Sequence, residues 1–278
     1  MVIEGIGIPD RYAVIGHPVA HSRSPLVHRC FAEQTDQIMN YTRIDATPEA
    51  FAATVHTFFR ERGRGLNVTL PHKERALALA SVVSDRARLA GAVNTLTLNA
   101  DGTLSGDNTD GIGLVRDLRD NLGLALRGLR ILLLGAGGAA RGVLADLLTE
   151  QPATVVVANR TPAKSHELAR TFFKLGKVKG CTYRVLRDKH FDLVVNATSA
   201  SVAGLLPPLR DELAADAVCY DMYYADHDTP FTRWAKEHGA RAAYLGFGML
   251  VEQAAESFRI WRGVSPQTRP VIALLRKP

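Results

Sequence analysis

The chain has 278 residues, of which 46% are hydrophobic, and this is enough apolar material for two domains that each bury a core. No apolar run approaches the roughly 20 residues that cross a bilayer, the N-terminal segment MVIEGIGIPDRYAVIG lacks a secretory-signal pattern, and the three scattered cysteines predict neither disulfides nor a metal site. The formal charge of +6 is spread along the chain without a nucleic-acid motif, so we expect a cytoplasmic protein with anionic small-molecule ligands and with no nucleic-acid or membrane partner.

The first part of the chain alternates predicted strands with predicted helices. The strands are expected at 11–16, 40–44 and 65–69, and the helices from Ser24, within 48–62 and near Lys73. Ser24 and Pro25 are the favoured pair for a helix N-cap and the first helical position. The repeated strand–helix order predicts a mostly parallel sheet.

A second unit begins near Leu129 with an apolar run, residues 130–134, of the kind found in strands covered on both faces. Further strands are expected at 154–158, 191–196 and 218–222, and a final helix from Gly248 to Trp261. The whole pattern predicts an α/β protein made of two α/β domains.

The first strand of this second unit leads into the pattern G-x-G-x-x-A at Gly135, Gly137 and Ala140. Glycines there allow a tight turn and a close approach of a pyrophosphate to the backbone, and the helix that follows supplies free N–H groups. The alternative, an ordinary glycine turn, is disfavoured by the strand–helix–strand order around it. The pattern therefore predicts a Rossmann-type domain that binds a dinucleotide through Gly135, Ala136, Gly137, Gly138 and Ala139.

The end of the next predicted strand indicates which nicotinamide cofactor binds. An NAD enzyme usually has an acidic residue there, which holds the ribose 2′-hydroxyl. This chain has Asn159, Arg160 and Thr161, with Lys164 one turn later. A guanidinium, a hydroxyl and an ammonium suit a 2′-phosphate, so these residues favour NADP over NAD.

Polar residues gather at four chain reversals of the first part, where a plain core would not need them. The segments are 21–25 with Ser22 and Ser24, 67–73 with Thr69 and Lys73, 90–95 with Asn94, and 106–111 with Asp110. Each residue also has a simpler interpretation: a helix cap, a turn residue or a solvated lysine.

Taken in order and spacing, these segments closely resemble the shikimate dehydrogenase family along almost the whole chain. The matching segments of the first part are 12–16, 21–25, 67–73, 91–95 and 108–111. Those of the second part are 135–139, 159–161, 196–199, 220–223 and 248–255. The resemblance implies an NADP-dependent reduction of 3-dehydroshikimate to shikimate, a step of aromatic amino acid biosynthesis, in a cleft between the two domains.

The resemblance also implies a role for each candidate residue. Lys73 and Asp110 would form the acid–base pair at the reacting oxygen. The other substrate-binding residues would be Ser22, Ser24, Thr69, Asn94, Tyr223 and Gln253. Besides the glycine turn and the 159–164 segment, the cofactor would contact Thr198, Met222, Gly246 and Met249. No metal is expected, because the histidines lack ligand spacing and lysine can act as the electrophile.

Because the final helix would return to the first domain, we expect a discontinuous substrate-binding domain, 1–112 with 246–278, and an NADP-binding Rossmann domain, 113–245. The protein is expected to be a monomer or a homodimer.

Two residues depart from the family pattern, and two other functions stay open. Ser201 stands where the family usually has glycine, and Leu245 where it usually has aspartate. One alternative is a quinate/shikimate dehydrogenase that uses NAD, which the 159–161 segment disfavours. The other is a non-catalytic NADP-binding sensor, which would have lost the Lys73 and Asp110 pair.

Overall fold

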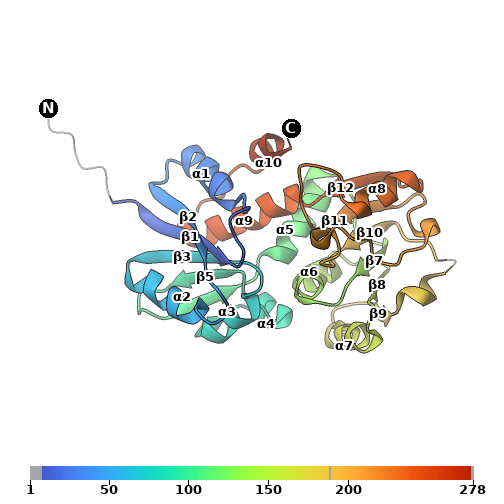
Figure 1. The fold of residues 1–278 in the computed structure, drawn as a ribbon, viewed down its shortest axis with the longest axis horizontal. Helices are drawn as coiled ribbons and strands as arrows, with labels where there is room; N and C mark the ends of the chain where they lie inside the picture. Colours follow the sequence, from blue (N-terminus) through green and yellow to red (C-terminus); the bar gives the residue numbers. More distant parts are fainter. Residues whose placement is uncertain (1–7, 188, 277–278) are drawn as a thin grey trace. The chain divides into compact units, whose positions relative to one another are not determined.

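The structure is a computed structural model that describes residues 8–187 and 189–276. Residues 1–7 of the N-terminal segment, for which no secretory signal is expected, lie outside the described residues. The chain forms two compact units (Figure 1): the described residues up to Thr109 with Gln253–Val271, and Asp110–Glu252 with the described residues from Ile272 onward. No helix in the described part of the chain is long and apolar enough to cross a membrane.

The first unit is built on a six-stranded sheet with the order β2-β1-β3-β5-β6-β4. Its strands are β1 (Asp10–Gly16), β2 (Met39–Asp45), β3 (Gly63–Val68), β4 (Val82–Val83), β5 (Thr95–Leu98) and β6 (Leu104–Asp107). Strand β1 pairs in parallel with both β2 and β3, and β4 pairs in parallel with β6. Strand β5 is antiparallel to both its neighbours. The predicted parallel-rich sheet is confirmed, whereas the β5–β6 hairpin was not predicted.

Helices cover both faces of this sheet. They are α1 (Ser24–Gln34), α2 (Phe51–Arg60), α3 (Lys73–Leu79), α4 (Asp85–Ala90) and the part of α9 (Phe247–Arg262) from Gln253 onward. Neighbouring side chains of a strand point to opposite faces of the sheet. On one face Ile15 of β1 packs into a core with Phe51 of α2. On the other face Tyr12 contacts Trp261 of α9, with ring centroids 4.8 Å apart.

The second unit has six strands that are all parallel, in the order β12-β11-β10-β7-β8-β9. They are β7 (Arg130–Leu134), β8 (Thr154–Ala158), β9 (Val178–Cys181), β10 (Leu193–Asn196), β11 (Val218–Asp221) and β12 (Ala242–Leu245). Counted from β7, this is the order 3-2-1-4-5-6 of a Rossmann domain, in which the chain reverses direction across the sheet between β7 and β10. Ligands of such sheets bind at the carboxyl ends of the strands beside that switch point.

The helices of the second unit lie against a sheet whose central strands β7, β10 and β11 are buried on both faces. The long helices are α6 (Gly138–Thr149), α7 (Pro162–Phe172) and α8 (Pro230–Glu237), and a shorter helix, α5 (Asp110–Arg116), continues into a π-helix at Asp117–Asn121. Phe231 and Trp234 of α8 pack with Leu132 and Cys219 of the sheet in one core cluster. The remaining short elements are 3₁₀ turns at Tyr183–Leu186, Ser201–Ala203 (η3) and Asp211–Leu213, and the C-terminal helix α10 (Arg269–Leu275).

Candidate active site

The two candidate carboxylate-binding serines lie at the start of α1 and are hydrogen-bonded to each other. Ser22 and Ser24 are 7% and 6% exposed. The Ser22 hydroxyl donates to Ser24 Oγ over 3.2 Å, and the Ser24 backbone N–H donates to Ser22 Oγ over 3.3 Å. Ser24 was predicted as the N-cap, but it is the first helical residue: Arg23 occupies the N-cap and makes no side-chain cap. Ser22, rather than Ser24, thus binds a free N–H of the first turn.

Thr69 lies in the loop between β3 and α3, which packs closely on the end of β1. The Thr69 N–H donates to Ile15 O over 2.9 Å, and His17 N–H donates to Leu70 O over 3.0 Å. A Cβ on Gly16 would lie 2.4 Å from the Thr69 methyl group, so this approach requires glycine. Lys73, half-buried, follows as the first residue of α3. Strand pairing therefore positions Thr69 and Lys73 at the carboxyl end of β3.

Asn94, Thr109 and Gln253 meet in one polar cluster, although they come from three distant segments. The Asn94 amide donates to Thr109 Oγ1 over 2.9 Å and to Gln253 Oε1 over 3.4 Å. The Thr109 backbone N–H donates to Asn94 Oδ1 over 2.9 Å. Asn94 is 2% exposed and Gln253 is half-buried, so the cluster has a buried base and an amide at its rim.

A buried network joins this cluster to the serine pair, and its members were not predicted as site residues. Asn67 Nδ2 donates to Ser257 Oγ over 2.9 Å, and Ser257 Oγ lies 2.8 Å from Thr95 Oγ1. The Tyr41 hydroxyl donates to Asn67 Oδ1 over 2.7 Å and also hydrogen-bonds the Ser24 side chain. Burial raises the pKa of Tyr41 well above its ordinary value.

Three of these additional residues had a signal in the sequence. Asn67 and Thr95 lie in the polar segments 67–73 and 90–95. Ser257 follows Gln253 by four positions, which places both on one face of a helix. Tyr41, on the edge strand β2, becomes recognisable only from the sheet order.

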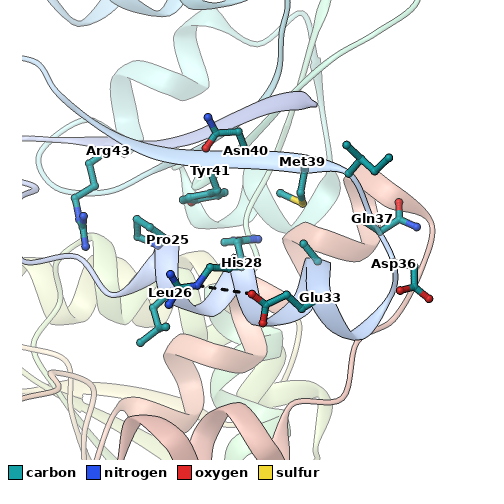
Figure 2. Close-up of a pocket in the computed structure, with 13 residues that line it drawn as sticks. Pro25, Leu26, His28, Glu33, Asp36, Gln37, Met39, Asn40, Tyr41 and Arg43 are labelled. Atoms are coloured by element: carbon teal, nitrogen blue, oxygen red, sulfur yellow. Dashed lines mark ion pairs between the residues drawn. The ribbon is translucent and has the colours of Figure 1, made fainter. Parts of the chain in front are cut away.

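Figure 2 shows a surface pocket of about 960 Å³ between α1 and β2 in the first unit, lined by residues such as His28, Tyr41 and Arg43. Arg43 Nη2 and Nε donate to Ser22 O over 2.6 and 3.0 Å. No candidate site residue lines this pocket. Two of its lining residues hydrogen-bond to the serine pair: Arg43 to the Ser22 carbonyl and Tyr41 to the Ser24 side chain.

Asp110 begins α5 and belongs to the second unit, whereas Lys73 belongs to the first. Asp110 is 7% exposed. The next residue, Gly111, allows α5 to pack on α6, because a Cβ there would lie 2.9 Å from Gly142 O. Two turns further on, Asp117 accepts a hydrogen bond from the Tyr220 hydroxyl over 2.7 Å, and burial raises the pKa of its carboxyl. The pairing of Lys73 with Asp110 stays a prediction.

The glycine turn between β7 and α6 presents open backbone at the switch point of the sheet. Gly135 has φ +99°, a conformation that favours glycine, and its Cβ position lies 3.1 Å from Ala197 O beyond β10. Gly137 is the extended N-cap of α6 and Gly138 its first residue, and a Cβ on either would meet no atom within 4 Å. This surface fits a pyrophosphate, which needs free N–H groups and close approach.

The residues at the end of β8 lie on the surface. Asn159 Nδ2 donates to Thr161 O over 3.0 Å, which shapes the turn into α7. Arg160, Thr161 and Lys164 are exposed. The structure thus places a hydroxyl and two basic side chains beyond the strand, where an NAD enzyme has a carboxylate.

The remaining cofactor candidates follow the carboxyl ends of β10, β11 and β12. Thr198 Oγ1 donates to Asn196 Oδ1 over 2.7 Å. Met222 N–H donates to Asn196 O over 3.0 Å, and Gly246 N–H donates to Tyr223 O over 3.0 Å. Met249, 8% exposed, donates its N–H to the Tyr220 hydroxyl over 3.3 Å. Adjacent parallel strands therefore bring Thr198, Met222, Tyr223 and Gly246 to one edge of the sheet.

Neither the cysteines nor the acidic and histidine residues form a further reactive cluster in the described part of the chain. Cys30 and Cys181 are half-buried, and Cys219 is buried, which raises its pKa to about 12. No group of three or more His, Cys, Asp or Glu residues that could hold a metal ion occurs among residues 8–187 and 189–276.

One unit thus carries a polar cluster suited to a small hydroxylated molecule, and the other carries a Rossmann sheet with a dinucleotide-type glycine turn. These features define the class of two-domain, dinucleotide-dependent α/β enzymes. Family models match the chain in three places: the shikimate dehydrogenase substrate binding domain at 14–96, shikimate / quinate 5-dehydrogenase at 118–206, and the shikimate 5'-dehydrogenase C-terminal domain at 246–276.

Individual relatives are similar over nearly their whole length. The shikimate dehydrogenase (NADP(+)) of Methylococcus capsulatus is 57% identical over 268 residues, covering 96% of each chain. The crystal structure of an Ael1 enzyme from Pseudomonas putida has a TM-score of 0.91 at 47% identity, covering 97% of this chain and 99% of that one. The shikimate 5-dehydrogenase of Thermus thermophilus in complex with NADP(H) and shikimate has a TM-score of 0.83 at 36% identity, covering 96% and 98%. The chain belongs to the shikimate dehydrogenase family.

Proposed function

We propose that this chain is an NADP-dependent shikimate dehydrogenase, which reduces 3-dehydroshikimate to shikimate and runs the reverse oxidation. The observation that carries the proposal is the cluster of Asn94, Thr109 and Gln253. Amides and hydroxyls held on a buried base suit the ring hydroxyls of a small polar substrate. Similarity to relatives of that activity over almost the entire chain supports the same reaction.

The residues of the first unit would bind the substrate at both its ends. Ser22 and Ser24, at the start of α1, would hold the substrate carboxylate with help from the free N–H groups of the helix. Thr69, Asn94 and Gln253 would hydrogen-bond the ring hydroxyls. From the second unit, Asp110 and Tyr223 would complete this set.

Lys73 is the proposed proton donor. When bound, NADPH supplies the hydride that reduces the ketone. The Lys73 ammonium would donate a proton to the developing alkoxide and stabilise its charge, and Asp110 would orient that ammonium. In the reverse oxidation neutral Lys73 would accept the proton from the reacting hydroxyl as hydride leaves the same carbon.

The second unit would hold NADP through three groups of residues. Gly135, Ala136, Gly137, Gly138 and Ala139 would cradle the pyrophosphate. Asn159, Arg160, Thr161 and Lys164 would bind the adenosine ribose and its 2′-phosphate. Thr198, Met222, Gly246 and Met249 would line the nicotinamide end.

The wider biological setting belongs to the same proposal. We infer a substrate-binding domain of 1–112 with 246–278 and an NADP domain of 113–245, so that Asp110 and the start of α9 act with the substrate-binding residues. We further infer a cytoplasmic enzyme of aromatic amino acid biosynthesis, monomeric or homodimeric, without nucleic-acid or membrane partners.

A spectrophotometric assay tests the function directly. The purified protein is mixed with shikimate and NADP, and absorbance is followed at the nicotinamide band. We expect NADPH to form, at a kcat/KM well above that with quinate or with NAD. Equal or higher rates with quinate and NAD would identify the quinate-type enzyme instead. NADP binding without turnover of either substrate would identify a non-catalytic sensor.

A further inference from the structure

Ser201, the residue that replaces the family's usual glycine, belongs to a buried hydrogen-bond network of the second unit. It is the first residue of η3, after the loop that carries Thr198, and is 5% exposed. Its hydroxyl donates to Asp221 Oδ2 over 2.6 Å and accepts a hydrogen bond from Asn196 Nδ2 over 3.0 Å. A glycine at this position would lack both bonds.

Asp221, at the end of β11, is a fully buried carboxylate held by neutral donors. Besides Ser201, the Thr229 hydroxyl donates to Oδ2 over 2.7 Å. Asn196 Nδ2 and the Tyr223 N–H donate to Oδ1 over 3.2 and 3.1 Å. Burial raises the pKa of this carboxyl, while these donors stabilise its ionised form. Hydrogen bonds to a buried carboxylate are stronger than neutral ones, so the network resists rearrangement.

The network connects the two segments that carry cofactor candidates. Asn196 binds Asp221 through its amide nitrogen and accepts from the Thr198 hydroxyl and N–H through its oxygen. Asp221 in turn accepts from the N–H of Tyr223, next to Met222. Ser201, which follows the Thr198 loop, hydrogen-bonds to both Asn196 and Asp221 and so links the end of that loop to both strand ends.

We propose that Ser201 is a positioning residue for cofactor binding: by donating to Asp221, it holds the Thr198 loop and the Met222 and Tyr223 segment in the arrangement that accepts the nicotinamide end of NADP. The inference rests on the proposed function. Ser201 acts through Asp221 and Asn196 rather than by touching the cofactor. The Ser201 hydroxyl therefore orders the Thr198 loop before NADP binds, so that less conformational entropy is lost on binding.

The test compares Ser201→Ala, which lacks the hydroxyl, with Ser201→Thr, which keeps it. Val202→Ala is the matched control, because Val202 lies in the same turn and is 59% exposed. NADPH fluorescence titration should give a Kd about 5- to 20-fold higher for Ser201→Ala and within about twofold of wild type for the other two. Steady-state kinetics should show the same rise in the KM for NADP, with kcat at saturation little changed.

Hydrogen exchange on the ligand-free protein gives a second readout. Amides of 197–204 and 222–229 should exchange faster in Ser201→Ala, with protection elsewhere unchanged. Wild-type Kd and exchange in Ser201→Ala would overturn the inference, and so would a uniform loss of protection, which indicates a merely structural role. If Ser201→Ala does not fold, Ser201→Gly, the family residue, is measured instead. A wild-type protein that binds no NADPH overturns the proposed function together with this inference, whereas wild-type binding with unaffected Ser201 variants overturns the inference alone.

Discussion

Lys73 is the residue on which the proposed chemistry most depends. It is the first residue of α3 and is half-buried, directly after the Thr69 loop. Lys73→Met keeps the length of the side chain and removes its charge. If the ammonium acts mainly in the transition state, kcat should fall by about 10²–10⁴-fold while the KM for shikimate changes little. Steady-state kinetics in both directions measures the loss.

The matched control for Lys73 is its neighbour in the same turn. Glu74 is exposed, so Glu74→Gln should leave kcat within about twofold of wild type. A circular-dichroism melt establishes that both variants are folded. A folded Lys73→Met protein with near-normal kcat would contradict the mechanism, because a solvated first-turn lysine is then sufficient to explain the residue.

Arg160 is expected to decide the choice of cofactor. It is exposed beyond β8, and the segment contains no carboxylate that would repel a phosphate. Because only NADP carries the 2′-phosphate, Arg160→Ala should raise the KM for NADP by roughly 10- to 100-fold and change that for NAD little. Arg170→Ala removes an exposed arginine from the last turn of α7 and should affect neither cofactor. An equal rise in the KM for NADP and for NAD in Arg160→Ala would contradict the assignment of Arg160 to the 2′-phosphate.

At the scale of elements, replacing two glycines of the second unit by alanine should have opposite effects: one on NADPH binding and the other on stability. A Cβ on Gly138 would meet no atom within 4 Å, whereas one on Gly246 would lie 2.4 Å from Met222 O, a backbone atom. Gly138→Ala should therefore fold with wild-type stability but bind NADPH weakly, because its methyl group occupies the space that a pyrophosphate needs. Gly246→Ala should lower the free energy of unfolding by about 1–3 kcal/mol.

Thermal or urea unfolding and NADPH titration of the two variants separate these effects. A Gly138→Ala protein with unchanged NADPH affinity would mean that the turn does not cradle the pyrophosphate. Gly246→Ala of wild-type stability would mean that β12 can move away from Met222 at little cost.

The regular elements show where local patterns are informative. The expected strands at 130–134 and 154–158 coincide with β7 and β8, because unbroken apolar runs bounded by glycine or polar residues are typical of buried parallel strands. The β5–β6 hairpin was missed because its segment contains asparagine, glycine and aspartate, which also indicate turns. The N-cap of α1 was misplaced by one residue: Ser24 suits that position by type, but the structure places Arg23 there, and Ser22 binds the Ser24 N–H.

At the scale of the whole molecule, His28 predicts how stability depends on pH. Its ring is fully buried, with Nε2 3.2 Å from Asn67 Oδ1 and no hydrogen-bond partner for Nδ1 among the described residues. Burial lowers its pKa from 6.5 to about 3. At a pH below the pKa of 6.5 that His28 has in the unfolded chain, the unfolded chain binds a proton that the folded chain does not. The contribution of His28 to the free energy of unfolding is therefore fully present above pH 6.5 and is lost as the pH falls toward 3, by up to about 1.4 kcal/mol per pH unit.

Urea unfolding at a series of pH values between about 7 and about 5 tests this dependence. His28→Gln keeps an N–H donor for Asn67 but does not titrate, so its stability should fall less steeply with decreasing pH than that of wild type. His56→Gln, a change at an exposed histidine of α2, should leave the wild-type slope unchanged. Identical slopes for wild type and His28→Gln would show that other groups cause the acid sensitivity.

The amino-acid sequence by itself determined the features that depend on neighbours in the chain. Apolar runs and periodicity located β1, β2, β3, β7, β8, β10 and β11 and the helices α1, α2, α6 and α9. The spacing of Gly135, Gly137 and Ala140 after a strand predicted a dinucleotide turn. The order of polar segments along the chain was sufficient to recognise the family, because each of those segments is short and local.

Only the tertiary structure decided which polar groups meet. Asn67 and Ser257 are 190 residues apart in the chain, and Ser201 and Asp221 are 20 apart, yet each pair shares a short hydrogen bond. A buried hydroxyl or amide must find a partner, but residue type alone does not say which one. The strand order β12-β11-β10-β7-β8-β9 of the Rossmann unit determines the partners, because it brings the ends of β10 and β11 side by side. Ser201 departs from the family pattern in the sequence, and its proposed role depends on the buried Asp221 carboxylate that packing places beside it.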